Sequence, residues 1–173
     1  MTEPSPQALR GSHYVNRETA RRAVHLAMPM IEAGLADRRL VGSGFLYLVI
    51  MDPGLTPDRC GFEEAILHEQ AFGDRSQWDA DYAAFARGKA KLSWTTGMDS
   101  RRLQTLSPHL LRTGDSLLWG SVCLDGIVVA ASGAFPQFDE VYAGTVAYWL
   151  RALAKEGREA DNGRLSLEPA GGD

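Results

Sequence analysis

The 173-residue sequence has few cysteines, no long apolar run and only a small excess of one charge. Its two cysteines, Cys60 and Cys123, are too few for a disulfide scaffold. The longest uninterrupted apolar run covers residues 45–51, whereas a membrane span needs about 20 residues. The first 22 residues contain no apolar stretch of the kind found in secretory signals. We therefore expect a cytoplasmic protein that does not enter a membrane.

Charge and motif content exclude further classes of protein. Eighteen Lys and Arg against 22 Asp and Glu give a net charge of −4, which argues against a general nucleic-acid binder. The spacings H-E-x-x-H and C-x-x-C do not occur, so a dedicated zinc site is not expected. The phosphate-binding loops G-x-x-x-x-G-K-[ST] and G-x-G-x-x-G are also absent from the sequence. The remaining composition is that of an ordinary globular domain.

The two ends of the chain differ in composition from the middle. Residues 1–15 are polar and contain two prolines and a glycine, which is typical of a disordered arm. Residues 157–173 contain four glycines and many charges, and we expect a disordered tail there. Residues 16–156 then form a single domain, a length that buries a core without disulfides or metals.

Apolar spacing predicts three main helices. The first covers residues 16–34, with an asparagine as its N-terminal cap and a glycine at its end, and Pro29 inside it predicts a bend or break. The second begins at Asp79 or Asp81, either of which is a suitable cap. The last covers residues 139–157, because two acids suit the positive end of a helix and a glycine suits its end.

Strand signals occupy the segments between these helices. Residues 44–51 are continuously apolar and stop at an Asp-Pro-Gly turn, which predicts a strand buried on both faces. Residues 117–124 and 127–131 flank an Asp-Gly pair, the pattern of a hairpin with a type I′ turn. Residues 62–71 fit either a helix or a strand. The sequence thus predicts an α+β domain with a mainly antiparallel sheet flanked by helices.

Several motifs resemble one known family. Residues 125–133 read DGIVVAASG and are followed by the acids at 139–140, which resembles the C-terminal signature of the GlcG/HbpS-type haem-binding family. The strand that ends at residues 52–54 resembles the family's V-D-x-x-G, and residues 86–90 resemble its A-x-x-K-A helix. The resemblance spans residues 18–155.

The resemblance implies a profilin-like fold and a homo-oligomer, a dimer or larger, with ligands near subunit contacts. It also implies haem or a related planar tetrapyrrole as the ligand, and a strand over residues 65–70. The chain departs from the family pattern at residues 69–74, at the bulky Trp119 that opens the hairpin, and around residues 56–60, which look like an insertion. These changes fall where a ligand would lie and indicate a modified pocket.

A small-molecule site is the first functional hypothesis. A strand would place His68 beside Ile66 and Gln70 on one face, and His109 follows Pro108 in a loop. A structural role for either histidine stays open beside iron ligation. Aromatic residues, among them Phe135, would line the pocket, and the hairpin ends would offer backbone groups. The residues assigned to cofactor binding are His68, His109, Tyr82, Phe85, Trp119, Gly120, Ser132 and Gly133.

Lys89 suggests a second hypothesis, an enzyme on the same scaffold. It lies on a mostly apolar helix face, where loss of solvent disfavours its ammonium form unless a carboxylate pairs with it. Asp52 and Asp139 are the expected partners. A structural ion pair, a contact to a ligand carboxylate and proton transfer all stay open. As an enzyme, the chain would use Lys89, His68 and Asp139 for acid/base chemistry on a small organic substrate.

Overall fold

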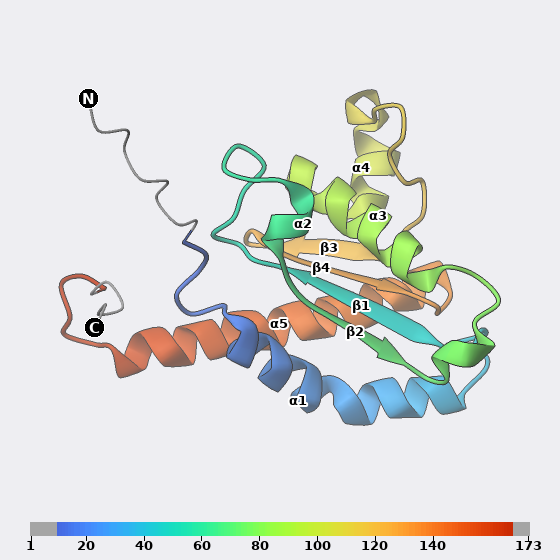
Figure 1. The fold of residues 1–173 in the computed structure, drawn as a ribbon, viewed down its shortest axis with the longest axis horizontal. Coiled ribbons are helices and arrows are strands. Elements are labelled where there is room, and N and C mark those ends of the chain that lie inside the picture. The colour runs from blue at the N-terminus through green and yellow to red at the C-terminus, as the bar shows by residue number, and fades with distance from the viewer. Residues whose placement is uncertain (1–9, 168–173) are drawn as a thin grey trace.

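The computed structural model describes residues 10–167, whose strands form one four-stranded antiparallel sheet (Figure 1). The strand order is β2-β1-β4-β3, so that β1 and β4 lie in the centre and every neighbouring pair is antiparallel. The strands are β1 (Leu46–Met51), β2 (Ile66–Phe72), β3 (Ser121–Leu124) and β4 (Ile127–Ser132).

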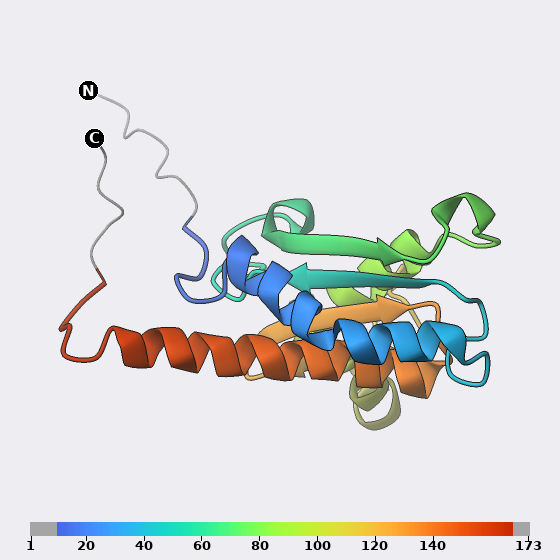
Figure 2. The same ribbon diagram turned by 90° about the horizontal axis from the view of Figure 1, so that it is seen from below.

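Helices cover both faces of this sheet, which confirms the predicted α+β architecture (Figures 1 and 2). The long helices α1 and α5 pack on one face, and α3 packs on the other. None of the helices within residues 10–167 is long and apolar enough to cross a membrane. The helices are α1 (Arg17–Ala36), α2 (Phe62–Ala65), α3 (Tyr82–Thr96), α4 (Ser100–Leu106) and α5 (Pro136–Ala160), with 3₁₀ turns η1 (Arg75–Gln77) and η2 (Pro108–Leu110).

The central strand β1 is buried on both faces, as its continuous apolar run predicts. Alternate side chains point to opposite faces of a strand. Leu46, Leu48 and Ile50 therefore pack with α1 and α5, whereas Tyr47 and Val49 pack with α3. Two apolar clusters, one on each side of the sheet, form the core.

The hairpin of β3 and β4 has the predicted tight turn. Asp125 and Gly126 both have positive φ angles, 51° and 86°, as a type I′ turn requires. The first strand of the hairpin is shorter than predicted, because pairing with β4 begins at Ser121 and not at residue 117. Residues 117–120 instead lie as irregular chain before the sheet.

The ambiguous segment 62–71 contains both predicted structures, a single helical turn (α2) and then a strand (β2). The strand implied by the family resemblance is confirmed. A register shift opposite Ile50 and Met51 places Ile66 on the α3 side and His68 on the α1 side. The expectation that Ile66 shares a face with His68 and Gln70 is therefore wrong.

Helix α1 begins at the predicted cap. The side chain of Asn16 accepts hydrogen bonds from two backbone amides of the first turn, both at 3.0 Å. The helix then continues through Pro29 and past Gly34 to Ala36, so its predicted end is wrong. Figures 1 and 2 show it changing direction along its length, as expected when a proline removes one backbone hydrogen bond.

Helix α5 is longer than predicted at both ends. It starts at Pro136, where a missing amide hydrogen costs nothing in the first helical turn. At its other end it passes Gly157 and stops at Ala160, and the ring of Tyr14 packs directly against that glycine. The first residues of the predicted tail, 157–160, therefore belong to α5. Residues 168–173 lie outside the described part of the chain.

The expected arm over residues 1–15 makes contacts with the domain in its last part. The amide of Ser12 donates to the carboxylate of Asp52 at 2.8 Å, and Val15 is buried in the core. These contacts extend the packed body beyond its predicted start. Residues 1–9 lie outside the described part of the chain.

Two glycines provide a matched test of the fold. A Cβ at Gly133, whose φ is +131°, would overlap the carbonyl oxygen of Phe45. A Cβ at Gly144 inside α5 would meet no atom within 4 Å. Gly133→Ala is expected to lower the free energy of unfolding by more than about 2 kcal/mol. Gly144→Ala is expected to raise it by about 0.5–1 kcal/mol. Urea unfolding measures both changes. Equal stability of the two variants would contradict the close approach of Gly133 to the backbone of Phe45.

Candidate functional site

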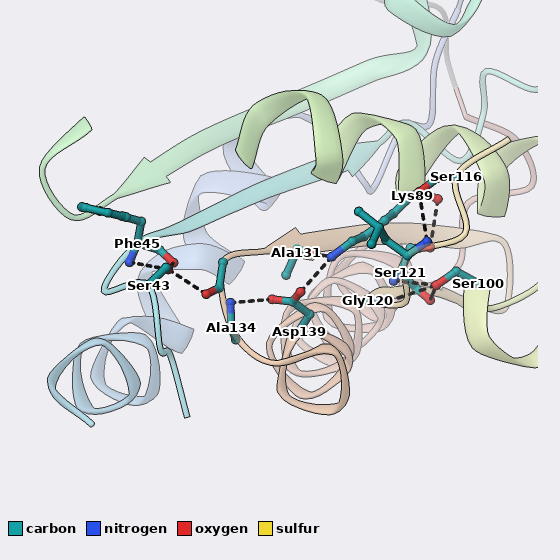
Figure 3. Close-up of polar contacts among 12 residues, drawn as sticks. Ser43, Phe45, Lys89, Ser100, Ser116, Gly120, Ser121, Ala131, Ala134 and Asp139 are labelled. Atoms are coloured by element: carbon teal, nitrogen blue, oxygen red, sulfur yellow. Dashed lines mark hydrogen bonds and ion pairs between the residues drawn. The ribbon is translucent and has the colours of Figure 1, made fainter. Parts of the chain in front are cut away.

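A buried ion pair joins the two faces of the sheet beyond the end of β4 (Figure 3). The Nζ of Lys89, from α3, donates to Asp139 Oδ2 at 2.8 Å and to the carbonyl oxygen of Ala131 at 2.9 Å. Asp139, in the first turns of α5, also accepts from the amide of Ala134 at 3.0 Å. Both charged side chains are only 3% exposed. The pair predicted from the sequence is therefore formed, and it is almost dry.

Burial shifts both groups toward their neutral forms. Loss of solvent lowers the pKa of Lys89, and its attraction to Asp139 opposes this shift. Loss of solvent likewise raises the pKa of Asp139 from 3.8 to about 6, against the effects of Lys89 and the Ala134 amide. The expectation that Asp52 also pairs with Lys89 is wrong. The carboxylate of Asp52 lies at the opposite end of β1, where it accepts hydrogen bonds from the backbone amides of residues 12 and 54.

Gly120 seals the ion pair from solvent. Its φ is +123°, and a Cβ at this position would lie 2.6 Å from Asp139 Cβ and 2.9 Å from Lys89 Nζ. Only a residue without a side chain brings its backbone this close to both charges. No substrate reaches the pair while this backbone is in place.

Three buried serines hold the chain around Gly120, and the sequence analysis did not identify them. The hydroxyl of Ser100 accepts from the amides of Gly120 and Ser121 at 3.2 and 3.1 Å. The hydroxyl of Ser121 donates to the carbonyl oxygen of Lys89 at 2.9 Å and lies 2.7 Å from the hydroxyl of Ser93. These bonds attach the start of the hairpin to α3 and α4. Only Ser121, next to Gly120 in the sequence, could have indicated this network.

The predicted catalytic group is not assembled. Lys89 and Asp139 meet, but His68 lies on the α1 side of the edge strand β2, whereas Lys89 comes from α3 on the other side. The Nε2 of His68 lies 3.2 Å from Oε1 of Gln70. The structure therefore separates His68 from the proposed acid and base.

The residues assigned to cofactor binding lie in several places. Tyr82 and Phe85 are neighbours, with ring centroids 6.5 Å apart. Trp119 lies instead under the guanidinium of Arg101, at 5.9 Å, and His109 belongs to η2. In the described part of the chain, neither Trp119 nor Phe135 pairs with the rings of Tyr82 and Phe85. The remaining assigned residues form the backbone beside the ion pair or at the end of β4: Gly120, Ser132 and Gly133.

Tyr82 and Phe85 belong to a larger group of rings that the sequence analysis did not find. These rings contact one another in tilted or edge-to-face arrangements, with centroids 5.5–6.5 Å apart. They come from β1 and the preceding loop, from the chain after η1, and from the start of α3. We call this group the aromatic cluster: Phe45, Tyr47, Trp78, Tyr82 and Phe85.

The aromatic cluster has three properties of a ligand-binding surface. Phe85 is 41% exposed, whereas Tyr47 and Tyr82 are buried, so the cluster reaches solvent mainly through Phe85. The indole nitrogen of Trp78 is buried and has no hydrogen-bond partner among the described residues. The guanidinium of Arg75 lies 4.8 Å above the ring of Trp78. Apolar rings, an unpaired donor and an adjacent cation thus lie together in one place.

Comparisons with known proteins identify a fold. No protein-family model matches the chain, and no curated protein sequence is similar to it. The chain is similar to a solved structure, a double mutant of HbpS from Streptomyces reticuli, with a TM-score of 0.52 and 21% identity over 85% of this chain and 97% of that one. A second similar solved structure is protein ORFY of Klebsiella pneumoniae, which is assigned to the family DUF336. It has a TM-score of 0.47 and 13% identity, over 88% of this chain and 99% of that one. The chain therefore has an HbpS-like fold, as the resemblance implied.

The buried pair predicts unequal effects of single and double substitutions. Lys89→Met leaves the carboxylate of Asp139 buried without a counter-charge, so we expect it to lower the free energy of unfolding by about 3–5 kcal/mol. Adding Asp139→Asn removes this charge and keeps an acceptor for the Ala134 amide, so the double variant is expected to be more stable than Lys89→Met. Urea unfolding measures the difference. Equal losses in both variants would show that charge is not the cause.

The raised pKa of Asp139 predicts a pH dependence of stability. Between pH 3.8 and about 6, the folded chain binds a proton at Asp139 more tightly than the unfolded chain does. The stabilisation from this proton is present below this window and is lost as the pH rises through it. The free energy of unfolding of the wild type minus that of Asp139→Asn should therefore fall between about pH 4 and 6. A constant difference across this window would contradict the raised pKa.

Proposed function

We propose that this chain is a small-molecule-binding protein of the GlcG/HbpS type whose ligand is planar and largely apolar, with haem or a related tetrapyrrole as the first candidate. The HbpS-like fold and the motif resemblance support the family, and the aromatic cluster supports the ligand class. The aromatic cluster is the observation that carries the proposal.

The aromatic cluster suits a flat molecule for chemical reasons. Aromatic rings bury a large apolar surface and pack favourably against other π systems. A buried N–H without a partner, as at Trp78, costs about 1–3 kcal/mol, and a ligand acceptor that displaces the atoms covering it would remove this cost. Arg75 adds a guanidinium, which pairs well with carboxylates such as those on a tetrapyrrole edge.

Within one chain, the residues present do not fit a haem at the aromatic cluster whose iron is held by His68 or His109. His68 lies on the other side of β2 from the aromatic cluster, and His109 lies in η2, after α4. The proposed site therefore recognises the plane and the edge of the macrocycle and does not use either histidine as an axial ligand.

A homo-oligomer belongs to the same proposal. Large apolar side chains on two parts of the surface support it: Leu106 and Leu117 are each 69% exposed, and Tyr148 on α5 is 58% exposed. Exposed apolar groups that gather on a surface often form contacts between chains.

The alternative of an acid/base enzyme has less support. The ion pair of Lys89 and Asp139 is covered by Gly120, and His68 is absent from it. Such a pair joins elements of the fold and offers neither a free base nor a free acid to a substrate.

Titration with haem and with iron-free protoporphyrin IX tests the proposal. Both are expected to bind saturably, because the site holds the macrocycle and not the iron. Phe85→Ala should weaken both affinities about tenfold, since one stacking ring contributes about 1–3 kcal/mol. Phe135→Ala is the matched control, because Phe135 is similarly exposed, at 46% against 41%, but lies outside the aromatic cluster. Absorbance titration measures all these affinities, and His68→Ala should retain them.

Two outcomes would contradict the proposal. If haem binds and protoporphyrin IX does not, with binding lost in His68→Ala, iron ligation by His68 replaces the aromatic cluster as the basis of the site. If neither compound saturates the chain, a tetrapyrrole ligand is excluded.

A further inference from the structure

A shallow basic depression runs along the outer edge of strand β2, from the first turns of α1 to Arg87 of α3. Figure 2 shows how the start of α1 lies beside β2. The volume of the depression is about 410 Å³. The charged and titratable side chains that line it come from α1, α2, β2 and α3: Arg17, Arg21, Glu63, His68, Glu69 and Arg87.

The acidic groups of this basic depression are already paired with Arg87. Its Nε and Nη2 bind the two carboxylate oxygens of Glu69 at 2.7 and 2.6 Å, which is a bidentate pair. Its Nη1 lies 3.2 Å from the carboxylate of Glu63. The hydroxyl of Tyr47 also donates to Glu69, at 3.2 Å. Glu63 and Glu69 are therefore engaged by groups other than the α1 arginines.

The cations on α1 have no such partner. Arg17 and Arg21 lie one helical turn apart, and neither forms an ion pair with a carboxylate of residues 10–167. Like charges at this spacing repel each other, and a cation in the first turn of a helix also opposes the helix dipole. By contrast, the adjacent Arg22 is paired with Glu156 at 2.9 Å. The depression thus holds three arginines against two carboxylates, and the two arginines of α1 have no direct ion-pair partner within residues 10–167.

We infer that the basic depression binds a small oxyanion, the carboxylate or phosphate group of a metabolite. Two guanidinium groups match the paired oxygens of such a group. The ring of His68, whose Nε2 already donates to Gln70, lies beside them on the strand and reports on the site. A bound anion would remove the repulsion between Arg17 and Arg21. This site shares no residue with the aromatic cluster, so it does not depend on the proposed function.

Titration of the full chain with inorganic phosphate and, separately, with acetate tests the inference. Nuclear magnetic resonance is expected to show saturable shifts of the His68 ring signals with at least one of the two anions. Arg21→Gln should weaken this binding about tenfold, because it removes charge-assisted hydrogen bonds. Arg22→Gln is the matched control, since it removes one charge from the adjacent position on the same helix and should leave the affinity unchanged.

Each outcome supports or overturns the inference. Saturation by phosphate alone or by acetate alone supports the site and identifies its preferred anion, and saturation by both supports an oxyanion site of broad specificity. Absence of saturation with either anion overturns it. Equal weakening by Arg21→Gln and Arg22→Gln also overturns it, because the effect would then come from overall charge. Thermal unfolding of both variants verifies that these exposed substitutions leave the fold intact.

Discussion

The ion pair between Lys89 and Asp139 is the contact on which the arrangement of the domain depends. It joins α3 and α5, which pack on opposite faces of the sheet, around the end of β4. Because both charges are out of water, each needs its partner and its backbone hydrogen bonds to remain there. Gly120 has no side chain for the same reason, and the serines around it fix the start of the hairpin against α3 and α4.

The burial of this ion pair under Gly120 limits where a ligand can bind. The pair uses its charges within the fold, and two surfaces outside it are suited to other molecules, the aromatic cluster and the basic depression. The aromatic cluster lies on the α3 face of the sheet, and the basic depression lies along the edge of β2. They differ in chemistry, because one offers rings and an unpaired donor and the other offers unpaired cations. A protein with both surfaces is suited to binding an aromatic molecule and an oxyanion at separate places.

The sequence predicts those features that depend on neighbours along the chain. The hairpin follows from Asp125 and Gly126, and burial of β1 follows from its apolar run. The pairing of Lys89 with Asp139 was predicted because a buried lysine needs a carboxylate. The face of His68 was not predictable, since it depends on a register shift between strands. The aromatic cluster was missed because its rings come from segments that only the folded sheet brings together.

The hydrogen on the indole nitrogen of Trp78 provides the most direct test of the proposed ligand site. Its signal in an amide-type ¹H–¹⁵N spectrum should shift when protoporphyrin IX is added. The indole of Trp94 is an internal control, because its nitrogen already donates to the carbonyl oxygen of Leu55 at 2.8 Å. The account predicts a large shift for Trp78 and little change for Trp94. An unchanged Trp78 signal, with shifts at His68 instead, would contradict it.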